Sequence, residues 1–310
     1  MTAPAERRNG GTAVPATDGV VPAADGAASV GSLLSDAERV LAAGGIAEPR
    51  REALMLWAAV TRTSPGHAWL QREVVAGEDD RVGFAAAVAR RAHGAPVAYA
   101  AGTAAFRSIE LAVDSRVLIP RPETEGLVQH VLDWCRAHNR WGVAVDIGTG
   151  SGCIALSLAA EGAFDRVIGT DLSLEALAVA RSNLDAVAPR TPVTLRHGDL
   201  LWAIGQERAD VVVSNPPYVS ADEWSAMDAG VRDYEPRLAL VGGVDGLAHL
   251  RGVLRLARSR LREGGLLALE LDCRRAGDVL ADARALGWAS ARVEFDLFGR
   301  ERYLLATWGT

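Results

Sequence analysis

The sequence predicts an α/β protein with a largely parallel β-sheet, a small helical domain before the sheet and an antiparallel hairpin at its end. Three observations support this fold class. After residue 121, short apolar runs alternate with helical segments, which is typical of parallel strands joined by crossover helices. Before residue 98, amphipathic helical spacing dominates. The last two apolar runs are separated only by a short turn, so we expect them to pair antiparallel.

The composition is that of a globular protein with one large and one small domain. The chain has 310 residues, of which 49% are hydrophobic and 23% are charged, and this is enough to bury two cores. A formal net charge of −6 weighs against broad contact with nucleic acid, which requires a basic face. The sequence has no run of 18 apolar residues and no signal-peptide pattern, so we expect a cytoplasmic protein without membrane spans.

The cysteines and histidines give no indication of a metal site. Cys135, Cys153 and Cys273 are scattered and lack metal-ligand spacing, which is typical of reduced thiols in a cytosolic protein. The six histidines are isolated from one another and from paired carboxylates. We therefore predict that no metal is bound.

The N-terminal part divides into a tail and a helical domain. Residues 1–30 are rich in Ala, Gly, Pro and Thr and show no periodicity, which predicts a disordered tail. Residues 31–98 contain amphipathic stretches and are predicted to form the helical domain. We expect Ser35 or Asp36 to cap the first helix, and the glycine pair at 44–45 to end it. The other two clear helices are expected after residue 49 and over residues 79–93.

The rest of the chain is predicted to be a connector followed by the sheet domain. Residues 99–120 alternate between apolar and polar side chains, as a connecting hairpin does, and residues 121–310 form the sheet domain. The clearest parallel strands are residues 143–147, 166–170, 193–196, 211–214 and 266–271, with helices at 154–160, 173–184 and 246–261, and the terminal hairpin at 291–296 and 302–307.

A glycine-rich loop, Asp146-Ile-Gly-Thr-Gly-Ser-Gly152, lies between a predicted strand and a predicted helix. Glycines allow a tight turn and let a ligand touch bare backbone. The spacing differs from the G-x-G-x-x-G fingerprint of pyrophosphate binding, and an acidic residue before the loop suits a ligand that carries an amino group and a sulfonium. A plain turn is the alternative. The residues predicted to contact the ligand are Asp146, Gly148, Thr149, Gly150, Ser151 and Gly152.

Two further acidic residues end the next two predicted strands. Asp171 is placed to accept both ribose hydroxyls of an adenosyl group, although it can also cap the helix that begins at Ser173. Asp199 is placed to accept from an adenine amino group, and its alternative is an ordinary turn residue. Acidic side chains at three successive strand ends predict S-adenosylmethionine as the cofactor.

The tetrapeptide Asn215-Pro-Pro-Tyr218 follows the fourth predicted parallel strand. It suits methyl transfer to a planar amide or amine nitrogen, whose delocalised lone pair makes it a poor nucleophile. Asn215 Oδ1 and the Pro216 carbonyl can each accept one N–H of that nitrogen. Pro216 and Pro217 stiffen the loop, and the Tyr218 ring can lie against the planar group. A proline turn after a strand is the alternative. We predict Asn215, Pro216 and Tyr218 as catalytic, and Asn215 to Tyr218 as the acceptor site.

Together these motifs resemble those of the HemK/PrmC-type protein-(glutamine-N5) methyltransferases. Three further segments carry the resemblance, which spans roughly residues 85–308. They are L-I-P-R-P-E-T-E at residues 118–125, Y-E-P-R-L-A-L-V-G-G at 234–243 with Asp245-Gly246, and F-D-L-F-G-R-E-R at 295–302.

The resemblance implies a class I S-adenosylmethionine-dependent methyltransferase with a Rossmann-like sheet. It implies methylation of the glutamine in the Gly-Gly-Gln motif of class I peptide chain release factors, by a monomer whose helical domain binds the substrate. It adds Leu200 and Asn215 to the cofactor contacts. Arg121 and residues 123–125 are expected to shape the pocket wall or to anchor the connection between the domains.

The sequence departs from the family pattern in two places besides the extra tail. Relatives often have an aromatic or bulky residue where this chain has Leu200, so adenine packing is expected to differ. Residues 269–275, L-E-L-D-C-R-R, lack the glycine and glutamine expected before the terminal hairpin.

Other functions stay open at this point. An N6-adenine or N2-guanine nucleic-acid methyltransferase shares the NPPY motif but predicts a basic groove, for which only a small patch of arginines is available. A paralogue acting on another protein or on a metabolite is a second alternative. A non-catalytic binding module is a third, and the intact NPPY motif argues against it. The arginines of the patch are Arg90, Arg91, Arg136 and Arg140.

Overall fold

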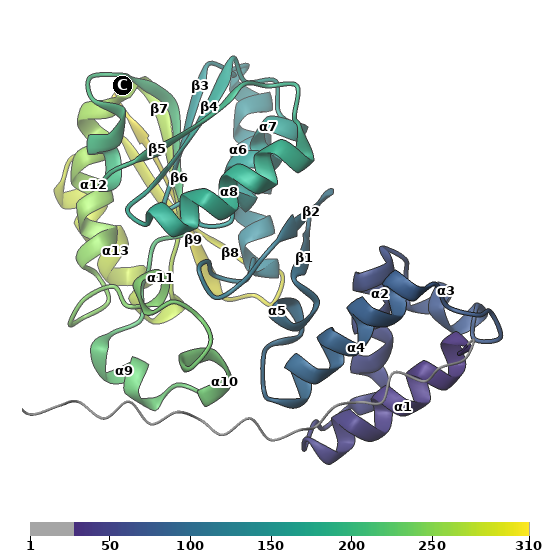
Figure 1. The fold of residues 1–310 in the computed structure, drawn as a ribbon. Helices are drawn as coiled ribbons and strands as arrows, with labels where there is room; N and C mark the ends of the chain where they lie inside the picture. Colours follow the sequence, from purple (N-terminus) through teal and green to yellow (C-terminus); the bar gives the residue numbers. More distant parts are fainter. Residues whose placement is uncertain (1–27, 310) are drawn as a thin grey trace, which may run out of the picture.

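The computed structural model describes residues 28–309 and shows a small helical domain beside a larger domain built on one sheet (Figure 1). The predicted tail at residues 1–30 lies outside the described residues except for its last three. Of these, Ser29 pairs with Val75 in an isolated antiparallel bridge, and Val30 begins the first helix. Within the described part of the chain, no helix is both long and apolar enough to cross a membrane.

The small domain is a bundle of short helices around an aromatic centre. Leu41 and Leu56 are buried in its core, and the Trp57 and Phe84 rings meet edge to face with centroids 5.1 Å apart. Each amphipathic helix turns its apolar face towards the others, which gives the domain a core of its own. The helices are α1 (Val30–Ala43), α2 (Pro49–Thr61), α3 (Pro65–Leu70), α4 (Glu78–Ala92) and α5 (Val97–Ala101).

The predicted start of the first helix is wrong. Ser29 is the N-cap, with extended backbone and a side chain that accepts a first-turn N–H at 3.2 Å. Ser35 lies inside the helix, where its hydroxyl donates to a carbonyl one turn earlier, and Asp36 forms a surface ion pair within the same helix. Because the buried face begins at Val30, the cap must lie upstream of both predicted residues. The predicted end is confirmed, since Gly44 is the C-cap.

The larger domain is built on a seven-stranded sheet with the strand order β5-β4-β3-β6-β7-β9-β8. Neighbouring strands from β5 to β7 are parallel, whereas β9 runs antiparallel to both β7 and β8. The predicted fold class, a parallel sheet that ends in an antiparallel hairpin, is therefore confirmed. The strands are β3 (Val143–Ile147), β4 (Arg166–Asp171), β5 (Val193–His197), β6 (Ala209–Ser214), β7 (Leu261–Glu270), β8 (Ser290–Phe295) and β9 (Glu301–Trp308).

Helices cover both faces of this sheet (Figure 1). Buried apolar residues of α6 and α7 pack on one face, next to α8, and those of α12 and α13 pack on the other. The principal helices are α6 (Pro122–His138), α7 (Cys153–Glu161), α8 (Leu174–Val187), α12 (Ala248–Arg260) and α13 (Ala276–Ala285). The short helices are η1 (Leu200–Ile204), α9 (Ala221–Ala226), α10 (Ala229–Arg232), α11 (Arg237–Leu240) and η2 (Cys273–Arg275).

The strand order reverses at β3, and this position determines where a ligand can bind. The chain continues from β3 to β4 and β5 on one side of the sheet, and β6 and β7 lie on the other side. A crevice opens at the carboxyl ends of the strands at such a reversal, because the flanking connections leave in opposite directions. The glycine loop follows β3 and the NPPY motif follows β6, so the fold brings both predicted motifs to one crevice.

An antiparallel hairpin connects the two domains, and a buried side chain, Asn183 of α8, is among the groups that attach it to the sheet domain. Asn183 Oδ1 accepts from the Ala112 N–H at 2.7 Å, and Nδ2 donates to the carbonyls of Ala112 at 3.0 Å and Ser151 at 2.8 Å. The connector is thus attached both to α8 and to the glycine loop. Its strands are β1 (Thr103–Phe106) and β2 (Ile109–Ala112), preceded by α5 where the hairpin is predicted to begin.

Candidate active site

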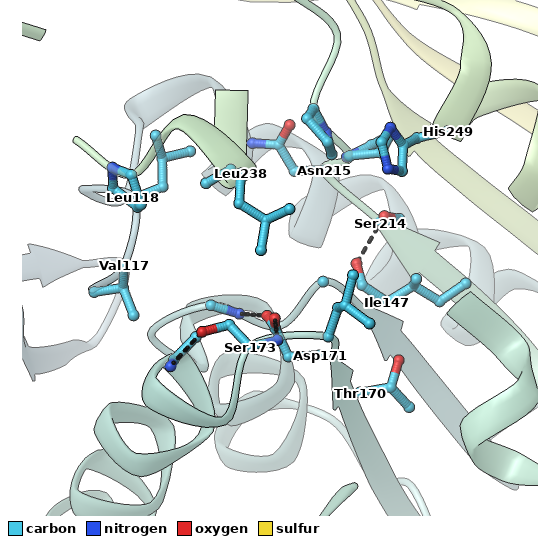
Figure 2. A pocket seen from close by; sticks show the side chains of 18 of the residues that line it. Val117, Leu118, Ile147, Thr170, Asp171, Ser173, Ser214, Asn215, Leu238 and His249 are labelled. Atoms are coloured by element: carbon cyan, nitrogen blue, oxygen red, sulfur yellow. Dashed lines mark hydrogen bonds between the residues drawn. The ribbon is translucent and has the colours of Figure 1, made fainter. Parts of the chain in front are cut away.

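A cavity of about 280 Å³ opens at the carboxyl edge of the sheet and is lined by both predicted motifs. Figure 2 shows Asp171 and Asn215 on opposite sides of it, with Leu238 pointing into the space between them. The predicted site residues on its wall are Gly148, Gly150, Asp171, Asp199, Leu200, Asn215, Pro216 and Pro217.

The glycine loop presents bare backbone to this cavity. Gly148 and Gly150 have φ angles of +69° and +55°, a left-handed conformation that glycine adopts without strain. A Cβ added to Gly148 would meet no protein atom within 4 Å, so the space beside it is open for a ligand. Gly152 differs, because its Cβ would lie 3.1 Å from Leu156 Cδ1. This third glycine serves helix packing rather than the cavity wall.

Asp146 lies behind the cavity and organises the loop. Its Oδ2 accepts from the Thr149 hydroxyl at 2.7 Å and from the Ala155 N–H at 3.1 Å. Its Oδ1 is buried without a hydrogen-bond partner among the described residues, and burial raises the pKa of this carboxyl to about 7. Thr149 and Ser151 are also buried and do not line the cavity. Of the predicted contacts in this loop, Gly148 and Gly150 line the cavity, and the other residues support the loop from behind.

Asp171 connects the glycine loop to the start of α8. Its Oδ2 accepts from the Gly150 N–H at 2.9 Å, and its Oδ1 accepts from the Ser173 N–H at 2.8 Å. Ser173 is the N-cap of α8, so Asp171 supports the start of that helix and also faces the cavity. Burial raises the pKa of Asp171. Each carboxylate oxygen retains a lone pair for a further donor.

Asp199 and Leu200 form the next part of the wall. Asp199 precedes η1 but makes no side-chain cap hydrogen bond there, so its carboxylate is not committed to helix capping. Leu200 has a φ of +46°, a left-handed conformation that is strained for a leucine. Leu200 lines the cavity at the position where the family pattern has a bulky or aromatic residue, and its side chain also packs against the core beside α12.

The NPPY loop, residues 215–218, is positioned by side chains from distant parts of the chain. Asn215 Nδ2 donates to the Thr124 hydroxyl at 3.0 Å, and that hydroxyl donates to Glu270 Oε2 at 2.7 Å. Thr124 lies in the first turn of α6, within residues 123–125 of the predicted wall, and Glu270 ends β7. The sequence prediction missed Glu270. Its one signal is a carboxylate inside the apolar run of residues 266–271.

The segment after the NPPY loop braces that loop from behind. The Val219 N–H donates to the Leu240 carbonyl at 2.9 Å, and the Gly242 N–H donates to the Val219 carbonyl at 2.8 Å. A Cβ on Gly242 would lie 2.2 Å from the Pro217 carbonyl oxygen, so only glycine allows this approach. Tyr218 is not on the cavity wall. Its ring packs against the buried core, and burial raises the pKa of its phenol.

The remaining predicted wall residues act as anchors. Arg121 pairs with the buried Glu235 at 2.6 Å. Glu125 Oε1 accepts from the Arg107 N–H of the connector at 3.0 Å, and the Tyr303 hydroxyl donates to the Glu123 carbonyl at 2.6 Å. The segment that begins α6 thus links the connector, the terminal hairpin and the NPPY loop.

The divergent residues before the terminal hairpin also brace the site. Arg275 Nη2 donates to Glu223 Oε2 at 2.7 Å, and its Nε donates to the Asp245 carbonyl at 3.1 Å. Arg275 is 8% exposed. Arg275 therefore links two parts of the segment that follows the NPPY loop, at a position where the family pattern has other residues.

Comparison with known proteins identifies the family. Residues 32–102 match the family described as PrmC N-terminal domain, and residues 124–232 match the one described as Methyltransferase small domain. The chain is 41% identical to the release factor glutamine methyltransferase of Moorella thermoacetica, over 88% of this chain and 96% of that protein. The chain belongs to the release factor glutamine methyltransferase family. The Streptomyces coelicolor protein of the same name is 37% identical, over 88% of this chain and 96% of that protein.

The structure also resembles the hMettl16 catalytic domain in complex with MAT2A 3'UTR hairpin 6. The TM-score is 0.51, with 15% identity over 74% of this chain and 81% of that chain. At this identity the likeness shows the fold alone. The predicted class I methyltransferase fold, the enzyme class and S-adenosylmethionine as the cofactor are confirmed.

The residues around the cavity fit this cofactor. The open backbone at Gly148 leaves room for a group that a side chain would displace. The carboxylates of Asp171 and Asp199 face the same space, together with apolar side chains such as Leu172 and Leu200. This combination suits a cationic ligand with a diol and an aromatic base. When bound, S-adenosylmethionine supplies an electrophilic methyl group. In the described residues no cluster of three or more His, Cys, Asp or Glu side chains is arranged to hold a metal.

Proposed function

We propose that this enzyme methylates the side-chain amide nitrogen of the glutamine in the Gly-Gly-Gln motif of class I peptide chain release factors. The observation that carries this proposal is the orientation of Asn215. Its NH₂ group is committed to Thr124 at 3.0 Å, so its carbonyl oxygen is left to accept from a planar N–H donor. The names of the relatives at 37–41% identity support glutamine as that donor.

The chain contributes positioning and electrostatics rather than a covalent nucleophile. Asn215 Oδ1 and the Pro216 carbonyl each accept one amide N–H, which fixes the nitrogen in line with the methyl group and favours its developing positive charge. Pro216 and Pro217 limit the reorganisation of the loop. Direct transfer inverts the methyl carbon, and the nitrogen loses its proton to solvent. On the proposed cofactor side, Gly148, Gly150, Asp171, Asp199, Leu200 and Asn215 line the cavity, and Asp146, Thr149, Ser151 and Gly152 support them from behind. On the proposed acceptor side, Asn215, Pro216 and Pro217 line the cavity, and Tyr218 supports the loop from the core.

The small domain is the proposed docking surface for the protein substrate. It exposes a patch of apolar side chains around Trp69, which is 45% exposed, including Leu70, Val74 and Val75. The Arg50 and Arg72 guanidinium carbons lie 5.0 and 5.1 Å from the centroid of the Trp69 ring. A patch that combines apolar and cationic groups suits a folded protein partner. We infer a monomeric cytoplasmic enzyme.

Each of the four arginines that could form a small basic patch has a hydrogen-bond or ion-pair partner within the chain. Arg90 donates to the Ala100 carbonyl, and Arg91 pairs with Glu52. Arg136 pairs with Asp133, and Arg140 donates to the Glu263 carbonyl. These contacts support a protein substrate over a nucleic acid.

The test is to incubate the enzyme with methyl-labelled S-adenosylmethionine and with either the cognate release factors or total nucleic acid. We expect label on the motif glutamine, and none on a release factor in which this glutamine is replaced by glutamate. Label that appears in nucleic acid, or on another residue of the release factor, would overturn the proposal.

A further inference from the structure

A buried carboxylate lies directly behind the NPPY loop without touching the cavity. Glu270 is 1% exposed and Thr124 is 2% exposed. With Asn215 they form a chain of two hydrogen bonds, of 2.7 Å and 3.0 Å, that joins β7, α6 and the loop after β6. The partners are 146 and 91 residues apart in the sequence. Such a side-chain network needs an explanation, because burying a carboxylate is costly.

In this series of hydrogen bonds, the direction of the first bond fixes the direction of the second. An ionised carboxylate can only accept, so the Thr124 hydroxyl must give its single proton to Glu270. The Thr124 oxygen can then only accept from Asn215, and it selects the NH₂ end of that amide. A flipped Asn215 would place its carbonyl oxygen against the Thr124 oxygen, two acceptors with no proton between them.

We propose that Glu270 and Thr124 are positioning residues for methyl transfer, which together set the amide of Asn215 so that its carbonyl oxygen faces the acceptor nitrogen. Neither residue lines the cavity, so both act through Asn215. This inference rests on the proposed acceptor chemistry, in which Asn215 Oδ1 accepts an N–H of the substrate.

The environment of Glu270 makes the direction of these two hydrogen bonds depend on pH. Burial raises the pKa of Glu270 to about 7, and Glu123 also raises it, whereas the Thr124 hydrogen bond, Arg302 of β9 and Arg121 lower it. The Tyr218 and Tyr303 phenols and the Cys153 thiol lie within electrostatic range of the same carboxylate.

A protonated Glu270 can donate to Thr124, which frees the hydroxyl to donate to the Asn215 carbonyl and admits the flipped amide. Since the carboxylate form predominates above its pKa, kcat should rise with pH through about 7 and fall below it.

The first test compares Thr124→Val, which removes the hydroxyl at similar volume, with Thr124→Ser, which keeps it. Thr191→Val is the matched control, because Thr191 is also buried but precedes β5, an edge strand that is three strands away from β6 in the sheet. We expect T124V to lower kcat on the release factor by about 100-fold, the scale of a misplaced reacting group. We expect T124S and T191V to stay close to the wild type, and all three variants to bind S-adenosylmethionine normally by calorimetry.

The second test uses Glu270→Gln, which keeps the shape but does not titrate. We expect its kcat to lose the rise near neutral pH that the wild type shows. Wild-type kcat in T124V, or an unchanged pH profile in E270Q, would overturn the inference. If T124V does not fold, two other results would also overturn the inference. One is a low kcat in T124S, and the other is a kcat in E270Q that still rises with pH near neutrality. Failure of the wild type to methylate the release factor would instead contradict the proposed function.

Discussion

The two sides of the catalytic cavity are held in different ways. On the cofactor side, Asp146 and Asp171 accept from backbone and hydroxyl donors of the glycine loop and of the starts of α7 and α8, between 2 and 21 residues away. On the acceptor side, Asn215 depends on Thr124 and Glu270, which come from remote elements. The cofactor side is thus a local structure that a short motif specifies. The acceptor side exists only when the whole fold is assembled.

The largest effect should come from Asn215→Ala. This change removes the acceptor for the substrate N–H, so kcat should fall by about 10²–10³-fold, the loss associated with one electrostatic contact in the transition state. S-adenosylmethionine affinity, measured by calorimetry, should change little. A variant with a near-normal rate would show that Asn215 does not have the assigned role.

Asp171→Ala should break the cofactor side instead. It removes a carboxylate that faces the cavity and also holds the Gly150 N–H. Hydrogen bonds to charged groups contribute about 1.5–3 kcal/mol, so the Kd for S-adenosylmethionine should rise by about 10–100-fold. Asp278→Ala, on the solvent side of α13, is the control. Unchanged cofactor binding in D171A would contradict the ribose assignment.

Gly242→Ala tests the brace of the NPPY loop. The added methyl would lie 2.2 Å from the Pro217 carbonyl oxygen, so the NPPY loop must shift. We expect kcat to fall by about tenfold, with a loss of stability of about 1–3 kcal/mol in urea unfolding, while cofactor affinity is retained. Gly277→Ala is the matched control, because a Cβ there meets nothing within 4 Å. Equal kcat values for the two variants would show that the brace does not position the loop.

The smallest effect is expected from Asp146→Asn, on the pH dependence of the free energy of unfolding. Burial raises the pKa of this carboxyl from 3.8 to about 7, so the folded state binds a proton more tightly than the unfolded state. Its contribution to stability is therefore complete below about pH 4 and is lost as the pH rises through about 7. Asp146→Asn can keep both hydrogen bonds of Oδ2 through its single oxygen and does not titrate. The free energy of unfolding of D146N should vary less over this pH window, and an identical pH dependence would contradict the assignment.

The sequence predicted the local parts of this molecule well. Strands such as β3 and β6 are mostly apolar, although each contains one aspartate, and a turn motif follows each of them. Their positions and the motifs that follow them are therefore visible in the sequence. The same holds for Asp171, whose hydrogen-bond partners Gly150 and Ser173 lie nearby in the chain. Helix periodicity located α1, although its cap was assigned to internal polar residues.

The parts that depend on tertiary contacts were not predictable in the same way. Glu270 ends an apolar strand, and nothing in the surrounding sequence indicates that Thr124 lies 2.7 Å away. The assignment of Asp146 as a direct ligand contact did not foresee that its side chain turns towards the Ala155 N–H. The family resemblance indicated the segments that matter, but the structure supplies the contacts that each segment makes.

The hydrogen bonds of Asn183 have a mechanical consequence. One buried amide is bound to Ala112 of the connector and to Ser151 of the glycine loop, so the end of the connector at Ala112 is fixed to the sheet domain. The same amide therefore couples the position of Ala112 to the backbone of the glycine loop, and a displacement of the connector at Ala112 should be felt there.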